Sequence, residues 1–215
     1  METFINTLPD IIQALGVIIL GYFTYNQYRR NKKTDLELEK VKEENKIKIE
    51  ELRDEQERKN RRRNDNSMII QGELWDILSE LNADRVYIVQ PHPLGNEDSL
   101  SVYYEVKRKG VEPMKPHIQK MPISQVSKFA SELAKHLFRY ITDIDAQVQD
   151  KYAKSIMSAY GSKGVIVKRL SNNEHDWVGS IFCEFTHDDM PTEEEAHEVM
   201  HRAATNIQYI LPEYK

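Results

Sequence analysis

The sequence predicts an α+β domain that is preceded by one transmembrane helix and a long helical stalk. Three observations carry this prediction. Residues 8–28 are nearly free of charge, and residues 34–66 are almost entirely polar without a glycine or proline. Residues 67–215 alternate amphipathic helical patterns with short runs rich in β-branched and aromatic residues. We therefore expect an anchor over residues 1–33, a stalk over 34–66 and one domain over 67–215.

The segment 8–28 fits a single transmembrane helix. No charge lies between Ile11 and Tyr25. A bilayer core about 30 Å thick needs roughly 20 helical residues, so the tyrosines at its end would lie at the interface. A signal peptide would carry its basic residues before the apolar run, whereas here they follow it. An interfacial helix would need a basic polar face, which this run lacks.

A basic cluster after the apolar segment predicts its orientation. The cluster comprises Arg29, Arg30, Lys32 and Lys33, and Lys or Arg flanks favour the cytoplasmic side. We therefore expect a single-pass membrane protein, in contact with lipid, whose soluble domain is cytoplasmic. Cys183 is the only cysteine, which excludes an intrachain disulfide and fits a reducing compartment.

The charged stretch 34–66 predicts a helix because good helix formers dominate it. Two interpretations of this stalk stay open. It is either a single solvated helix or a weak parallel coiled coil that would form a homo-oligomer together with the membrane helix. The apolar seam of the second interpretation is short and is interrupted by Lys48; it comprises Leu38, Val41, Asn45 and Leu52.

The first helix and two hairpins of the domain follow from periodicity and turn residues. Ile70, Leu74, Ile77, Leu78 and Leu81 fall on one helical face. Residues 85–90 and 100–107 predict one hairpin, and residues 165–170 and 177–186 predict another. Residues 110–122 hold three prolines and no periodicity, which indicates an irregular loop.

Three further helices complete the domain. We expect one from Ser124 through Tyr140, one over residues 150–160, and a closing helix that begins at Thr192. Thr192 and Glu195 have the spacing of a capping box. The order of elements predicts an antiparallel sheet with the first and last helices packed together on one face.

The pattern of residues 74–78, 83–89, 104–105 and 177–182, followed by the closing helix, resembles a GAF domain. GAF domains are small sensory folds related to PAS, and this resemblance covers about two thirds of the chain. It implies a non-enzymatic regulatory or recognition module that binds a small ligand or a protein. No nucleotide-binding motif or suitably placed chromophore cysteine matches, so it implies no cofactor. In such a fold the middle segment roofs the ligand pocket, which points to Tyr104, Glu105, Met114, His117 and Met121.

The layout also resembles the large phage holins of the T-even type. Those proteins have one N-terminal transmembrane helix, a polar stalk and a PAS- or GAF-like domain of similar length. The resemblance implies an alternative function, a lysis protein whose soluble domain regulates lysis timing. In holins that domain lies in the periplasm, which the basic cluster at residues 29–33 does not favour.

His197-Glu198-Val199-Met200-His201 matches the H-E-x-x-H pattern of zinc proteases. A catalytic zinc needs a third protein ligand, and Ala204 and Ile207 stand where the extended motif would supply glycine and histidine. We therefore interpret both histidines as the flank of a solvated helix and expect no metal site and no enzyme activity. The net charge of −5 disfavours a general nucleic-acid partner.

Overall fold

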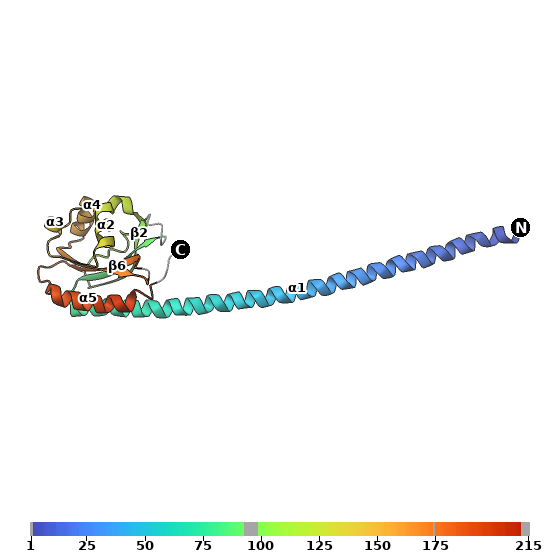
Figure 1. Cartoon of the computed structure of the whole chain (residues 1–215), viewed down its shortest axis with the longest axis horizontal. Helices are drawn as coiled ribbons and strands as arrows, with labels where there is room; N and C mark the ends of the chain where they lie inside the picture. Colours follow the sequence, from blue (N-terminus) through green and yellow to red (C-terminus); the bar gives the residue numbers. More distant parts are fainter. Residues whose placement is uncertain (1, 93–98, 174, 212–215) are drawn as a thin grey trace. The chain divides into compact units, whose positions relative to one another are not determined.

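The computed structural model describes residues 2–92, 99–173 and 175–211, and within the first helix it describes the side chains of residues 16–17, 20–34 and 37–80. That helix, α1, runs over Glu2–Glu80. The chain divides into two units, residues 1–60 and 61–215 (Figure 1).

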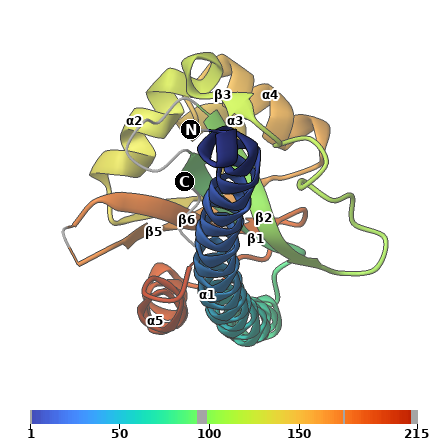
Figure 2. The ribbon, with the colours of Figure 1, turned by 90° about the vertical axis from the view of Figure 1, so that its right-hand side faces the viewer.

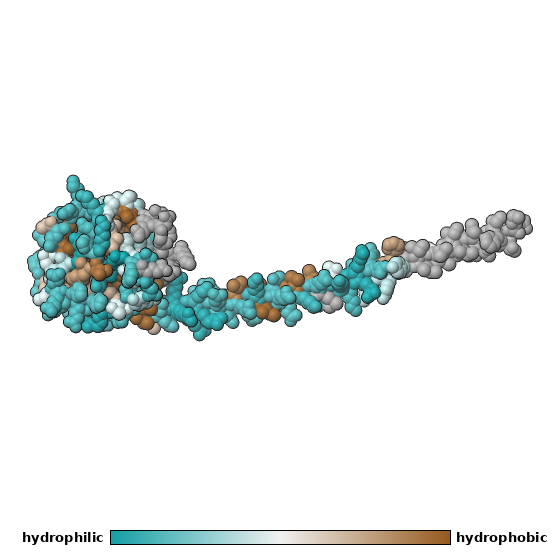
Figure 3. All heavy atoms as spheres, viewed as in Figure 1, coloured by the Kyte–Doolittle hydropathy of each residue, from teal (hydrophilic) through white to brown (hydrophobic). Residues whose placement is uncertain are grey.

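In the first unit the described residues all belong to the N-terminal part of α1. The predicted helix over the charged stretch is confirmed. Its apolar side chains are scattered among hydrophilic ones (Figure 3), and Leu38, Val41 and Leu52 are each more than half exposed. An ion pair one helical turn apart joins Glu55 to Lys59. The choice between a single helix and a coiled coil stays open.

The predicted transmembrane helix is not confirmed. Within the described residues, no helix has a run that is both long and apolar enough to span a membrane. About half of segment 8–28 falls on residues whose side chains lie outside the described part. The part that is described is interrupted by Thr24, Asn26 and Gln27 and ends at the basic cluster, which keeps its apolar run short.

The second unit is built on a six-stranded antiparallel sheet with the strand order β3-β2-β1-β6-β5-β4. Both predicted hairpins are confirmed, because β1 pairs with β2 and β5 pairs with β6. The two hairpins meet where β1 pairs with β6. The strands are β1 (Arg85–His92), β2 (Ser99–Lys107), β3 (Met121–Pro122), β4 (Phe138–Ile141), β5 (Gly164–Ser171) and β6 (Trp177–Phe185).

Helices cover both faces of the sheet (Figure 2). The C-terminal part of α1 and the closing helix α5 (Glu193–Ile207) pack on one face, as predicted, and bury Ile70, Leu74 and Ile77. The other face carries a 3₁₀ turn and three short helices, namely η1 (Ile123–Val126), α2 (Ser127–Lys135), α3 (Ile144–Gln147) and α4 (Lys151–Ala159). Each face has its own core, because successive strand residues point to opposite sides.

Two helix starts follow the sequence signals. Thr192 and Glu195 form the predicted capping box of α5, in which each side chain bonds to the backbone of the other residue. Asp150 caps α4 by accepting hydrogen bonds from the amides of Tyr152 and Ala153. The starts of α4 and α5 are therefore set by capping side chains that lie within a few residues in the sequence.

The predicted helix from Ser124 through Tyr140 is wrong in two respects. Its first turn is the 3₁₀ segment, and α2 lacks a side-chain cap at its N-cap residue, Val126. The helix ends at Lys135, and residues 138–140 belong to strand β4, which pairs with β5. Leu137, which extends the helical period in the sequence, is 63% exposed. Residues 138–141 find their backbone hydrogen-bond partners on β5 instead of in another helical turn.

Candidate functional site

A small apolar cavity lies between the sheet and the layer of α2 and α4. Three strands form its floor, and the segment before β3 closes it from the side. Its volume is about 30 Å³, room for one or two water molecules. The lining residues are Tyr87, Val89, Leu100, Met114, Ile118, Met121, Val126, Phe129, Leu133, Ala153, Ile156, Met157 and Phe182.

The cavity wall is aliphatic, aromatic and thioether in character. None of its lining residues is charged. The Tyr87 ring stacks on Phe182 with ring centroids 5.1 Å apart. The Tyr87 hydroxyl, the one polar side-chain group among the lining residues, donates a hydrogen bond to the Glu184 carboxylate. The cavity therefore offers dispersion contacts and little polar recognition.

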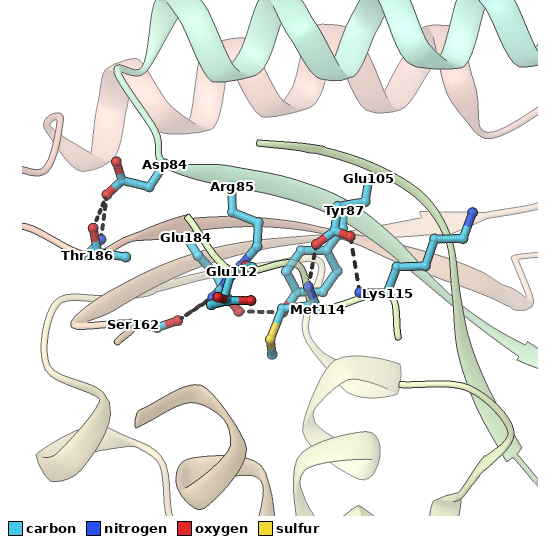
Figure 4. Close-up of polar contacts among 10 residues, drawn as sticks. All are labelled: Asp84, Arg85, Tyr87, Glu105, Glu112, Met114, Lys115, Ser162, Glu184 and Thr186. Atoms are coloured by element: carbon cyan, nitrogen blue, oxygen red, sulfur yellow. Dashed lines mark hydrogen bonds and ion pairs between the residues drawn. The ribbon is translucent and has the colours of Figure 1, made fainter. Parts of the chain in front are cut away.

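A buried polar network adjoins this wall (Figure 4). Arg85 on β1 and Glu184 on β6 are cross-strand neighbours, and the Arg85 Nε lies 2.9 Å from Glu184 Oε2. The Ser162 hydroxyl donates to the same oxygen over 2.7 Å and accepts from Arg85 Nη2 over 2.8 Å. Because every member has a protein partner, the buried charges are compensated within the domain.

The network sets the protonation of its members. Burial raises the pKa of the Tyr87 hydroxyl well above its usual range, and the nearby Glu184 carboxylate raises it further. Burial opposes the positive charge of Arg85, but attraction to Glu184 and Tyr87 leaves the pKa of Arg85 raised. Tyr87 is thus a neutral donor and Arg85 a permanent cation.

The segment over residues 112–120, here named the strap, closes one side of the cavity. The Glu105 carboxylate on β2 accepts hydrogen bonds from the backbone amides of Met114 and Lys115 (Figure 4). The Arg85 guanidinium donates to the backbone carbonyl of Glu112. Further along, the Val102 amide donates to the Ile118 carbonyl over 2.9 Å. Lys115, Gln119 and Lys120 add hydrogen bonds to β2, so the strap is held to the sheet along its length.

The structure divides the five predicted ligand-binding residues among four places. Met114 and Met121 line the cavity. Glu105 holds the strap instead, and His117 is exposed with its ring against Tyr160, 4.3 Å between centroids. Tyr104 lies in the core on the opposite face of the sheet, where its hydroxyl is 3.2 Å from that of Ser67. Tyr104 and Glu105 cannot share a face because they are adjacent on one strand.

Sequence reasoning missed the floor of the cavity and the buried network. Tyr87 and Phe182 belong to predicted strands, and strand alternation shows that each points to the same side as a charged neighbour two residues away. Those neighbours, Arg85 and Glu184, are charges inside otherwise apolar strands. That pattern was the available signal for a buried pair.

The H-E-x-x-H segment lies away from the cavity, on α5. The His197 and His201 rings are stacked with centroids 5.9 Å apart, and His197 also meets the Phe138 ring edge-on at 4.8 Å. In the described part of the chain, no group of three or more potential ligand side chains is arranged to hold a metal ion. The two rings pack as a flank of the helix.

Comparison with known proteins places the fold. No family model and no curated protein matches the chain. Two GAF domains match with a TM-score of 0.55: GAF3 of a Synechocystis protein in its photoproduct state (13% identity; 66% of this chain, 90% of that one) and the blue-light absorbing PixJ domain of Thermosynechococcus elongatus (14%; 67% and 83%).

A phycocyanobilin-bound GAF domain of a cyanobacterial phytochrome matches with a TM-score of 0.53 and 19% identity, over 66% of this chain and 82% of that one. The second unit therefore has a GAF-like α+β fold, as the resemblance implied. Identities this low show the fold alone. The comparisons lend no support to the holin resemblance.

Proposed function

We propose that the domain is a ligand-sensing regulatory module that binds a small molecule in the cavity between the sheet and the α2 and α4 layer. The observation that carries this proposal is the apolar cavity, which the strap borders on one side. The GAF-like fold supports it, since one structure of similar fold is a GAF domain bound to phycocyanobilin. Small-molecule sites are usually concave and largely apolar, and this cavity shares both features at a much smaller volume.

We also propose that the module recognises its ligand without chemical turnover. Catalysis by a protein side chain needs a nucleophile or an acid–base group directed at the substrate. Among the described residues that line the cavity, the one hydroxyl belongs to Tyr87, and it is already engaged with Glu184. The lining favours binding over reaction.

Strand β1 offers a route from the cavity to α1. Tyr87 lines the cavity, while its neighbours Val86 and Ile88 point to the other face and join the core that contains Leu74 and Ile77 of α1. A ligand that moves Tyr87 would therefore strain a strand that also supports α1. We propose that this strand couples ligand binding to the helix, and that oligomerisation through the stalk or a protein partner reads the change.

We further propose that the apolar segment near the N-terminus holds the module at a membrane with the domain on the cytoplasmic side. The uncharged run from Ile11 to Tyr25 and the basic cluster after it support this. A holin-type function would rest on the same segment order alone, and the cavity gives it no further support.

Methionine methyl groups can test ligand binding directly. Met114, Met121 and Met157 line the cavity, whereas Met68 is exposed and Met200 lies in the opposite core. In the full chain labelled at methionine methyls, members of a small-molecule panel should shift the three cavity signals and leave the other two in place.

A variant that fills the cavity supplies the control. Ala153→Leu places a larger side chain in the cavity and should abolish the response. Ala134→Leu makes the same change in α2, at a residue outside the cavity lining, and should preserve it. Shifts of the cavity signals that persist in Ala153→Leu would refute the proposed function.

A further inference from the structure

We infer that the cavity binds a small, uncharged, apolar molecule and that the strap is the segment that opens to admit it. We call the strap the gate and Glu105, whose carboxylate holds it closed, the latch. This inference rests on the proposed function and names its ligand class and its route of access. The inference follows from the absence of charge on the lining residues, the conformational flexibility of the lining side chains and the contacts that hold the strap.

The charge of the lining excludes anionic and cationic ligands. A buried ionised group needs a partner of opposite charge or several hydrogen bonds. The lining residues carry no charge, and the Tyr87 hydroxyl donates to Glu184. The nearest cation of the network, Arg85, is already engaged by Glu184, Ser162 and the Glu112 carbonyl. A carboxylate or phosphate in this cavity would have no described partner, whereas an uncharged apolar molecule needs none.

The lining can adapt to a guest larger than the present cavity. Three of its side chains are methionines, which are unbranched and have three rotatable bonds that let them fill irregular spaces. Two of the three, Met114 and Met121, come from the strap and the short strand after it. To admit an aromatic ring system, the cavity of about 30 Å³ must enlarge through a shift of the strap and of these methionines.

The strap is the part of the wall that can open at least cost. It has no helix or strand of its own, whereas α2 and α4 are helices packed on the core through Phe129, Leu133 and Met157. Segments with few regular hydrogen bonds open locally more readily than packed helices do. Opening the strap between residues 112 and 118 breaks the Glu105 and Arg85 contacts, the hydrogen bond from Lys115 Nζ to the Tyr103 carbonyl and the one from the Val102 amide to the Ile118 carbonyl. It also withdraws Met114 and Ile118 from the cavity.

Glu105 is the latch because its carboxylate accepts from two successive amides, those of Met114 and Lys115. Glutamine has one acceptor oxygen, so Glu105→Gln would set an amide donor against one of these N–H groups. Glu112 provides the matched control, since it contacts Arg85 through its backbone carbonyl. Glu112→Gln removes the same charge from the strap region and leaves the latch intact.

The ligand class is tested with two probes that share one ring system. Indole is neutral, and indole-3-carboxylate carries one negative charge at neutral pH. In the full chain, indole should shift the methyl signals of Met114, Met121 and Met157, and indole-3-carboxylate should bind at least tenfold more weakly. Equal or tighter binding of the carboxylate at these methyls would overturn the ligand class while leaving ligand binding intact. Loss of every cavity response, to these probes and to the wider panel, would instead refute the proposed function.

The gate is tested by amide hydrogen exchange and by association kinetics. Glu105→Gln should speed exchange of the Met114 and Lys115 amides and raise the indole association rate at least threefold, and Glu112→Gln should match the unaltered chain in both. Glu105→Asp, which keeps the charge on a shorter side chain, serves as the second variant if Glu105→Gln does not fold. If Glu105→Gln and Glu112→Gln have equal amide exchange rates at Met114 and Lys115 and equal indole association rates, the strap is not the gate.

Discussion

Arg85 and Glu184 form an ion pair in which both side chains are fully shielded from solvent. They face each other across the pairing of β1 with β6, which joins the two hairpins of the sheet. A buried pair stabilises little by itself, because desolvation offsets the attraction between its charges. Its main effect is on alignment, since a one-residue shift of either strand would turn a charge toward the opposite core.

Removing one partner of this pair should destabilise the domain strongly. Arg85→Met leaves the Glu184 carboxylate buried with only Ser162 and Tyr87 as donors. A stranded buried charge costs about 3–5 kcal/mol of unfolding free energy, measurable by urea denaturation. Replacing both partners by apolar residues should lower the unfolding free energy by less than the sum of the two single replacements.

The exposed pair between Lys163 and Asp188 provides the comparison. These side chains are 51% and 87% exposed, so Lys163→Met should change the unfolding free energy by about 1 kcal/mol or less. A similar loss of unfolding free energy in Lys163→Met and Arg85→Met would show that burial of the ion pair does not determine how much its removal destabilises the domain.

Local and periodic signals predicted most of the fold. The buried face of α1, the two hairpins and the capping box at Thr192 each follow from residues close together in the chain. The helix predicted through Tyr140 failed because Phe129, Leu133 and Leu137 keep helical spacing across a boundary. Only pairing with β5, more than 20 residues later, makes residues 138–141 a strand.

The candidate site was harder to predict than the fold. The resemblance placed Met114 and Met121 in a roof over a pocket, and both line the cavity, but the floor depends on which strand residues share a face. The Arg85–Glu184 pair joins residues 99 positions apart, and no local pattern brings them together. Glu105 was predicted to contact ligand, yet its carboxylate meets backbone amides of a loop whose conformation the sequence does not specify.

Tyr87 should make stability fall at high pH. Its folded-state pKa is raised by burial and by Glu184, so the folded state holds the proton more tightly than the unfolded state. The contribution is fully present below the unfolded pKa of about 10 and is lost as pH rises above it, by at most about 1.4 kcal/mol per pH unit. Tyr87→Phe should reduce this slope in denaturation curves above pH 10. An unchanged slope would mean that the Tyr87 phenol does not cause it.

Cys183 should be inert in the folded protein. Its side chain is fully buried in the core beneath α1 and α5, and burial, reinforced by Glu184 and Asp84, raises the pKa of its thiol well above the usual range. Because the thiolate is the reactive form, labelling by a thiol reagent should require unfolding. As a control, Leu137→Cys in a Cys183→Ser background places a thiol at a 63% exposed position and should react at once. Rapid native-state labelling of Cys183 would contradict its burial.

Membrane attachment should depend on the uncharged run near the N-terminus. Each charged residue at the centre of a membrane helix costs about 2.5–3.5 kcal/mol on the insertion scale. Val17→Asp with Leu20→Asp should therefore move the full chain from the membrane fraction to the soluble fraction. Leu38→Asp with Leu52→Asp makes the same changes in the charged stretch and should leave it in the membrane fraction. If the unaltered chain needs no detergent to stay in the supernatant after ultracentrifugation, the N-terminal segment is not a membrane anchor.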